Sequence, residues 1–198
     1  PSNKLSVVKD INGKTLKSII SNSGKLEANG GIIKLSAATA KYLSRASVNI
    51  GSSGMIVARS VNEKSGKVVI GSPIEDNIKI AGKIDVSGHK SHSPSGIVTV
   101  RGRSVSHSGK IFAKGRSGGK VNIISKDSIK LNGSILAQGS IDKGGSVIFM
   151  SEKSINSTPK VVVDVSAPNK AGEIRSLAKT TNTSSGLFKA NSSAGKGG

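Results

Sequence analysis

The sequence predicts an all-β fold, a parallel β-helix of about seven triangular coils. Three observations predict it: an aliphatic composition with few aromatic residues, a short motif that recurs at intervals of solenoid length, and period-two alternation of apolar residues between glycine corners. The chain has three Phe, one Tyr and no Trp, so Ile, Val, Leu and Ala must fill its core. Ile and Val favour strands, which indicates β structure before any pattern is considered.

The recurring motif is a glycine, any residue, an aliphatic residue, any residue, and then Ala or Val. Its copies begin at Gly24, Gly54, Gly82, Gly109 and Gly133, at intervals of 30, 28, 27 and 24 residues, and a late copy begins at Gly186. Repeats of this length are typical of solenoids. The 53-residue gap before Gly186 has room for two coils, and the segment from Val163 to Ala167 is the predicted missing copy, without its leading glycine.

Two further alternating pairs follow the motif in most repeats. One pair follows a second glycine, as Val98 and Val100 follow Gly96, and another stands just before the next repeat, as Ile78 and Ile80 do. Alternation with a period of two indicates strands with one buried face. Three short strands per repeat, separated by Gly and Ser corners, predict one triangular coil. Stacked about 4.8 Å apart, roughly seven coils would form a rod about 30–35 Å long.

Three parts of the chain follow from this pattern. Residues 1–23 are predicted to form an imperfect N-terminal coil or boundary segment, residues 24–158 regular β-helix repeats, and residues 159–198 degenerate repeats that stop in mid-coil. The Ala-rich segment 36–47 is either a helical turn inserted after the second strand or a loosely packed third face, and we favour the insertion. Segments 60–65 and 89–95 are predicted to be polar loops that protrude from the rod.

The charge balance points to polyanionic partners. Thirty Lys and Arg against eleven Asp and Glu give a net charge of +19, which favours nucleic acid, acidic glycan or an anionic membrane surface. The absence of cysteine excludes a disulfide framework and thiolate metal sites. No apolar stretch approaches the ~18 residues of a membrane helix. A scarcity of aromatic residues to stack bases argues against a specific nucleic-acid partner.

Residues 21–72, which include the segment "SGMIVARSVNEKSGKV", resemble the repeat region of filamentous-haemagglutinin-like exoproteins. "GKIDVSG", "GGKVNI" and "GSILAQGSIDKGGSVIF" continue the resemblance, which covers residues 20–150 well and the remainder loosely. The resemblance implies a right-handed parallel β-helix, secreted to the bacterial surface by a two-partner secretion system with an outer-membrane barrel transporter as partner. Such proteins act as adhesins or as stems of haemolysins and contact-dependent toxins. The family's secretion domain is not visible in this sequence.

The residues offer little chemistry for catalysis or metal binding. His89 and His92 share a loop with no Cys, Asp or Glu nearby, so we interpret them as solvated loop residues. His107 falls at an inward position of a third strand, where we expect a neutral histidine bonded to a backbone carbonyl. Asp85 and Asp164 share an outward column but lie about three rungs, ~14 Å, apart, beyond the ~5–10 Å of a glycosidase pair. We predict no catalytic residue, no metal and no cofactor.

Basic residues form the one candidate binding site. Lys25, Lys83 and Lys110 occupy the same outward place after the opening glycine, and further basic residues surround the coil at 109–132. Neighbouring lysines repel, and this suits a surface that meets a polyanion. The predicted glycan-binding residues are Lys25, Lys83, Lys110, Lys114, Arg116 and Lys120. The alternative is a solvated face in a lysine-rich chain, and we favour that alternative.

The sequence therefore favours a structural stem or adhesive segment of a secreted bacterial surface exoprotein that attaches to host or neighbouring cells. It is not expected to be an enzyme. An uncapped coil would allow end-to-end self-association. Two rivals stay open: an adhesin module that binds acidic host-cell glycan through the basic residues, and a carbohydrate-active β-helix enzyme.

Overall fold

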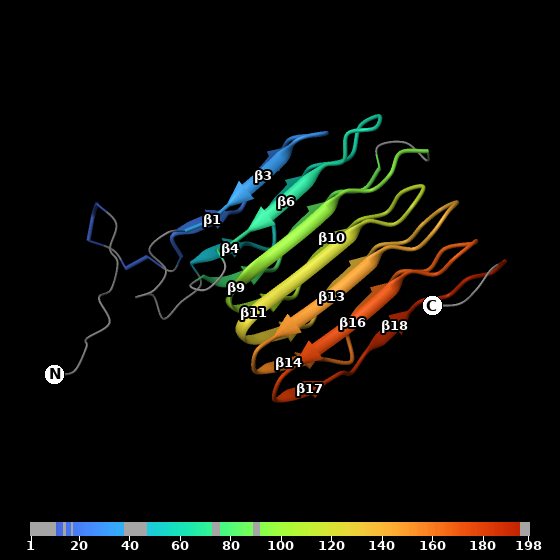
Figure 1. Ribbon diagram of the computed structural model, residues 1–198. Helices are drawn as coiled ribbons and strands as arrows, with labels where there is room; N and C mark the ends of the chain where they lie inside the picture. Colours follow the sequence, from blue (N-terminus) through green and yellow to red (C-terminus); the bar gives the residue numbers. More distant parts are fainter. Residues whose placement is uncertain are drawn as a thin grey trace.

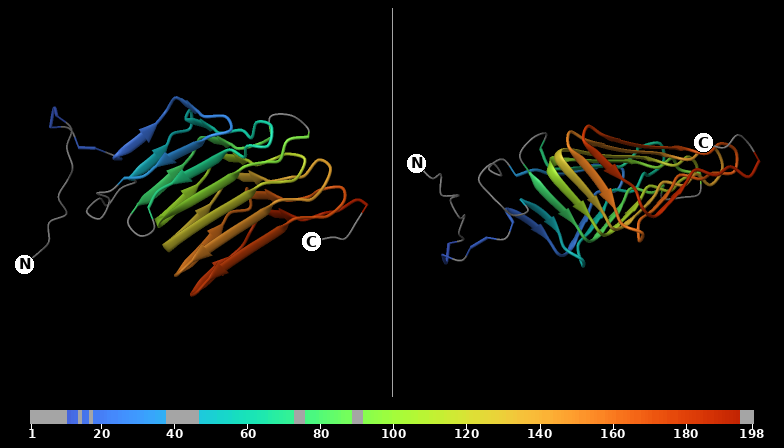
Figure 2. Two further views of the ribbon diagram at one scale, coloured as in Figure 1. Left: turned by 45° about the horizontal axis from the view of Figure 1, so that its top comes forward. Right: turned by 90° about the horizontal axis from the view of Figure 1, so that it is seen from below.

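The computed structural model describes residues 11–13, 15–16, 18–37, 47–72, 76–88 and 92–194 (Figure 1). Within these residues the chain is all-β, with eighteen strands and no helix. Every pair of neighbouring strands is parallel, and the strands stack as a β-solenoid of about six turns. The two views in Figure 2 show the coils following one another along a single axis, from the blue N-terminal coils to the red C-terminal ones.

One side of the solenoid, which we call face 1, is a seven-stranded sheet. Each of its strands is three residues long and begins at or just after the glycine or turn that opens a coil. The strands are β2 (Lys25–Glu27), β5 (Met55–Val57), β8 (Lys83–Asp85), β10 (Lys110–Phe112), β12 (Ser134–Leu136), β15 (Val162–Asp164) and β18 (Leu187–Lys189).

The other two sides belong to one 11-stranded sheet that bends between them. Face 2 consists of β3 (Ile32–Leu35), β6 (Lys67–Ile70), the first halves of β9 (Ile97–His107) and β11 (Lys120–Leu131), β13 (Ser146–Ser151) and β16 (Glu173–Ala178). Face 3 consists of β1 (Ile20–Asn22), β4 (Val48–Ile50), β7 (Asn77–Ile80), the second halves of β9 and β11, β14 (Ser154–Ser157) and β17 (Thr181–Thr183).

The bend between faces 2 and 3 is built from small inward side chains. Gly102, Ser125 and Ser151 stand in one column there, and the Ser125 hydroxyl donates a hydrogen bond to the Ser151 hydroxyl over 3.0 Å. A register shift between Ser125 and Ser128 marks an extra residue in β11. Such a bulge bends a strand locally, so β9 and β11 pass from one face to the next without interruption.

The predicted file of aliphatic side chains is confirmed. Leu26, Ile56, Ile84, Ile111 and Ile135 are consecutive partners across face 1. The file continues through Val163, the predicted missing copy, to Phe188. All its central members are fully buried. Complete burial of a side chain of this size contributes about 1.5–3 kcal/mol, so the interior files are the main source of stability.

Six complete turns, with β18 opening a seventh, agree with the predicted number of coils. In the N-terminal segment 1–23, β1 pairs with β4 on face 3. Beyond residue 158, strands β15 to β18 continue the same sheets in register. Most of the predicted helical turn, 38–46, lies outside the described residues, and Ser36, Ala37 and Ser47 beside it are not helical.

The loop at 60–65 is the predicted protrusion. A pair of backbone hydrogen bonds of 3.0 Å joins Val61 to Lys64 across a tight turn, and Asn62 adopts a φ of 55° in it. Residues 62–64 are exposed. In the second predicted loop, 89–91 lie outside the described residues.

Candidate polyanion-binding site

The structure places Lys25, Lys83 and Lys110 in one outward column of face 1, as predicted. The column is not continuous, however, because Met55 stands between Lys25 and Lys83. Lys83 and Lys110 are direct neighbours. Lys25 also pairs with Glu27 on its own strand, and the hydrogen bond from Lys25 holds the pKa of that carboxyl below its usual value. Met55 therefore separates Lys25 from the other two lysines, and Glu27 neutralises the charge of Lys25.

Lys83 lies in a cluster around Asp85. Its Nζ is 3.6 Å from Asp85 Oδ2 and 4.9 Å from the centroid of the Phe112 ring. Asp85 occupies an outward register position but is buried, because Arg59 Nη2 covers it at 2.9 Å. Burial alone would raise the pKa of Asp85, but the hydrogen bonds from Arg59 and Ser87 outweigh it and lower this pKa. The carboxylate is thus a structural anion rather than a general acid.

Of the three remaining predicted residues, only Lys114 shares a contact with Lys83. Lys114 Nζ lies 5.8 Å from the centroid of the Phe112 ring that Lys83 also contacts. Arg116 Nε forms an ion pair with Asp142 at 2.9 Å. Lys120 begins β11 on face 2.

A groove of about 380 Å³ at the corner between faces 3 and 1 contains Lys83 and Lys110, and it adds Lys160, which the sequence interpretation missed. Small and polar residues complete its lining: Ser52, Ser108, Ser134, Gly82, Gly109, Gly133, Ala81 and Asn132. Neither Lys110 nor Lys160 forms an ion pair with any residue that the structure describes. Two unneutralised ammonium groups, those of Lys110 and Lys160, beside serine residues suit a sulfate, phosphate or carboxylate group.

A second basic groove, of about 670 Å³, lies where the connections from face 1 reach face 2. Lys120, Lys143 and Lys170 line it with Glu173 and glycine backbone. Lys143 and Lys170 are bridge partners in successive coils, so their like charges stand one rung apart. Neither has an ion-pair partner in the described part of the chain. The only sequence signal for this cluster is the "KGG" and "KAG" that precede β13 and β16.

The acidic residues that could act in catalysis or metal binding do not form a cluster in the described part of the chain. Asp85 and Asp164 are separated in their column by Phe112 and Leu136, as predicted. Asp164 accepts a hydrogen bond of 2.8 Å from Gln138. Asp76 is fully buried and accepts a bond of 3.0 Å from the Ser47 hydroxyl. The described residues contain no group of three or more His, Asp or Glu that could hold a metal ion.

The predicted inward position of His107 is confirmed. The ring is buried between Ile80 and Leu131, and Nε2 donates to the Ser134 carbonyl over 3.3 Å. Burial lowers the pKa of His107 to about 4, although the Ser134 carbonyl acts in the opposite direction. The ring is therefore neutral at neutral pH. Of the two loop histidines, His89 lies outside the described residues.

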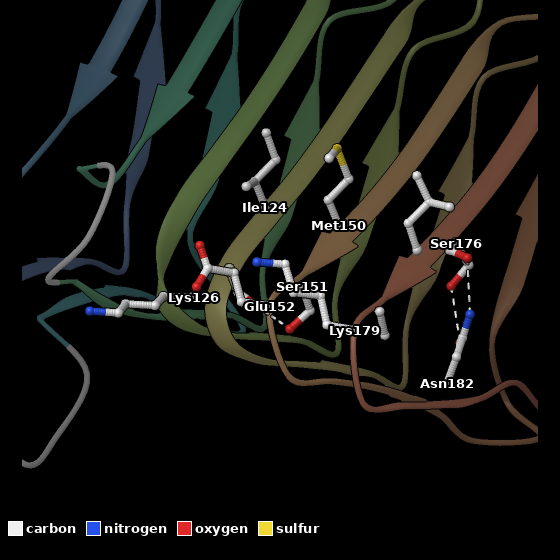
Figure 3. A pocket seen from close by; sticks show the side chains of 11 residues that line it. Ile124, Lys126, Met150, Ser151, Glu152, Ser176, Lys179 and Asn182 are labelled. Atoms are coloured by element: carbon white, nitrogen blue, oxygen red, sulfur yellow. Dashed lines mark hydrogen bonds between the residues drawn. The ribbon is translucent and has the colours of Figure 1, made fainter.

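A groove of about 810 Å³ lies along the bend between faces 2 and 3 (Figure 3). Its apolar part is one outward column, Ile124, Met150 and Leu177, and Lys126, Glu152 and Lys179 stand at its edge. The sequence interpretation missed this column because it looked for outward columns only among charged residues and treated the alternating apolar residues as inward. No helix in the described part of the chain is long and apolar enough to span a membrane.

Comparison of the chain with known protein families, with curated proteins and with solved structures finds no match. The parallel solenoid and its surface are therefore the observations that bear on function.

Proposed function

We propose that this chain is a structural and adhesive segment of a secreted bacterial surface exoprotein of the two-partner secretion type. In this role the solenoid holds a distal part of the protein away from the cell and presents a repetitive surface for attachment to host or neighbouring cells. The protein performs no reaction, and an outer-membrane barrel transporter exports it.

The observation that carries this proposal is the unbroken file of aliphatic side chains through all the described coils. Each coil contacts only its neighbours, so a solenoid makes a rod whose length is set by the number of repeats. The wide separation of Asp85 and Asp164 supports a role without catalysis, since sugar hydrolysis needs two carboxyl groups about 5–10 Å apart.

Attachment of coated beads to cultured epithelial cells tests the adhesive role. Beads that carry the folded chain should attach several-fold more than beads that carry an equal density of the Ile111→Asp variant, whose core is disrupted. Equal attachment of the two bead preparations would contradict the proposed adhesive role. A gene for an outer-membrane barrel transporter beside the gene for this protein would support the secretion route, and its absence would count against that route.

A second candidate is binding of acidic glycan, and the groove of Lys83, Lys110 and Lys160 favours it. Retention on a heparin column at physiological salt should fall when these three lysines are changed to Gln. A control variant with Lys64, Lys79 and Lys130 changed to Gln has the same net charge and should be retained like the parent. Equal loss in both variants would mean that only the total charge matters. Lys25→Gln alone should have little effect, because Glu27 already neutralises that lysine.

A further inference from the structure

Faces 2 and 3 belong to one bent sheet but present different side chains to the outside. The outward residues of face 3 are all polar: Asn49, Asn77, Lys79, Ser104, Ser106, Ser128, Lys130, Ser154, Asn156, Thr181 and Thr183. Outward positions of face 2 instead include aliphatic residues in each described coil: Ile32, Val69, Ile97, Ile124, Ile148, Met150 and Leu177. A sheet face in water alternates buried apolar with outward polar residues, so face 3 follows this rule and face 2 departs from it.

Beside the bend, outward apolar residues form a continuous column across three strands. Ile124, Met150 and Leu177 are register partners in three successive coils, and Met150 and Leu177 are 43% and 52% exposed. All three line the groove, and Figure 3 shows Ile124 and Met150 side by side on neighbouring strands. A contiguous apolar strip of this kind marks a surface that contacts something other than water.

The charges of face 2 indicate what kind of partner fits. Its outward basic residues are Lys34, Lys67, Arg101, Lys120 and Arg175, and Lys126 and Lys179 stand at the edge of the groove. The acidic side chains among the described residues of this face and the bend are Asp127, Glu152 and Glu173. Two of them are already paired, Asp127 with Lys153 and Glu173 with Arg175. The strip is therefore bordered mainly by unneutralised cations.

A second copy of the chain would place cations against cations, and a glycan offers only scattered C–H groups instead of a continuous apolar phase for the strip. A bilayer with anionic lipids offers both a negative surface and an apolar interior a few ångströms below it. We propose that face 2 is a docking surface for an anionic lipid bilayer. Met150 and Leu177 enter the boundary between headgroups and acyl chains, and the surrounding Lys and Arg side chains contact headgroup phosphates.

Co-sedimentation with lipid vesicles tests this proposal on the intact chain. The protein should sediment with vesicles made of equal parts of phosphatidylglycerol and phosphatidylcholine, and not with vesicles of phosphatidylcholine alone. The double variant Met150→Ser and Leu177→Ser should lose about tenfold or more in partition. Both side chains are half-exposed, so the fold should persist, as an unchanged far-ultraviolet circular dichroism spectrum would show. A control with Asn156→Ser and Thr183→Ser on face 3 should bind like the parent.

An inserted reporter gives an independent measurement. The chain has no tryptophan, so the Leu177→Trp variant carries a single indole, whose emission should shift to shorter wavelength when anionic vesicles are added. The Thr183→Trp control on face 3 should show no shift. Equal partition of the parent and the double serine variant would overturn the proposal, because adsorption would then depend on net charge alone. Equal shifts for the two tryptophans, or no binding to anionic vesicles, would also overturn it.

Discussion

At the scale of single residues, His107 is a polar side chain that costs stability in the core. It stands between Ile80 and Leu131 in a file that also contains Ile50, and that ends in the polar residues Asn22 and Ser157. Its Nδ1 is buried and has no hydrogen-bond partner in the structure. A buried ring nitrogen without a partner costs stability, and protonation of the ring there would cost more.

Unfolding at different pH values should reveal this residue. The pKa of His107 is about 4 in the folded chain and 6.5 in the unfolded chain, so only the unfolded chain takes up this proton between those values. Stability should therefore be complete above about pH 6.5 and fall as the pH drops toward 4. At about pH 5 the free energy of unfolding should be lower by about 2 kcal/mol than at about pH 7.5.

Urea denaturation at the two pH values measures this difference. The His107→Leu variant should remove most of it, since Leu131 shows that leucine fits the file. The His92→Gln variant, changed outside the core, should keep the pH dependence. A parent chain with equal stability at both pH values would contradict the account of His107.

At the scale of single elements, the tight corner between faces 3 and 1 requires glycine for lack of space. A Cβ at Gly109 would lie 2.0 Å from the backbone oxygen of Gly82, and one at Gly82 would lie 2.1 Å from that of Gly54. Neither residue has a positive φ, so close approach of successive coils is the cause. Gly24 holds the same place in the first coil, where a Cβ would meet no atom of the described residues within 4 Å.

This contrast makes a matched pair of substitutions. Gly109→Ala should destabilise the chain by about 2–3 kcal/mol, because backbone rather than a flexible side chain must move. Gly24→Ala at the equivalent place should change stability by less than about 1 kcal/mol. Thermal and urea unfolding of both variants measure the difference. A similar loss of stability in the two variants would mean that the corner glycines are needed for their backbone conformation and not for close packing of successive coils.

At the scale of the whole molecule, the solenoid brings like charges into register. A net charge of +19 and stacked pairs such as Lys83 with Lys110 and Lys143 with Lys170 oppose the compact state. The ion pairs among the described residues involve mostly exposed side chains, and exposed pairs contribute only about 0–1 kcal/mol each. Repulsion should therefore outweigh attraction at low ionic strength.

Salt should accordingly stabilise this protein. Raising the salt concentration from about 0.01 M to about 0.15 M shortens the screening length from about 30 Å to about 8 Å, so the melting temperature should rise by a few degrees. The double variant Lys143→Gln and Lys170→Gln should melt higher than the parent at low salt and respond less to added salt. A melting temperature that falls on adding salt would show that the ion pairs dominate.

The sequence by itself determined which side chains point inward. Period-two alternation, counted from the recurring glycine, predicted that Leu26, Ile56, Ile84, Ile111 and Ile135 point inward. The same alternation predicted that His107 lies in the core. These features could be predicted because each coil repeats the same short pattern and every strand pairs with the equivalent strand of the next coil. The same alternation also predicted the outward column of Lys25, Lys83 and Lys110.

Only the tertiary structure decided which outward residues meet. Lys160 reaches the groove of Lys83 and Lys110 from a turn that lacks the repeat's glycine, and Arg59 covers Asp85 from the preceding coil. The apolar column of Ile124, Met150 and Leu177 forms because β11, β13 and β16 pair in register after connections of unequal length. Alternation states which side of a strand a residue occupies, but its neighbours across the sheet depend on how each loop closes.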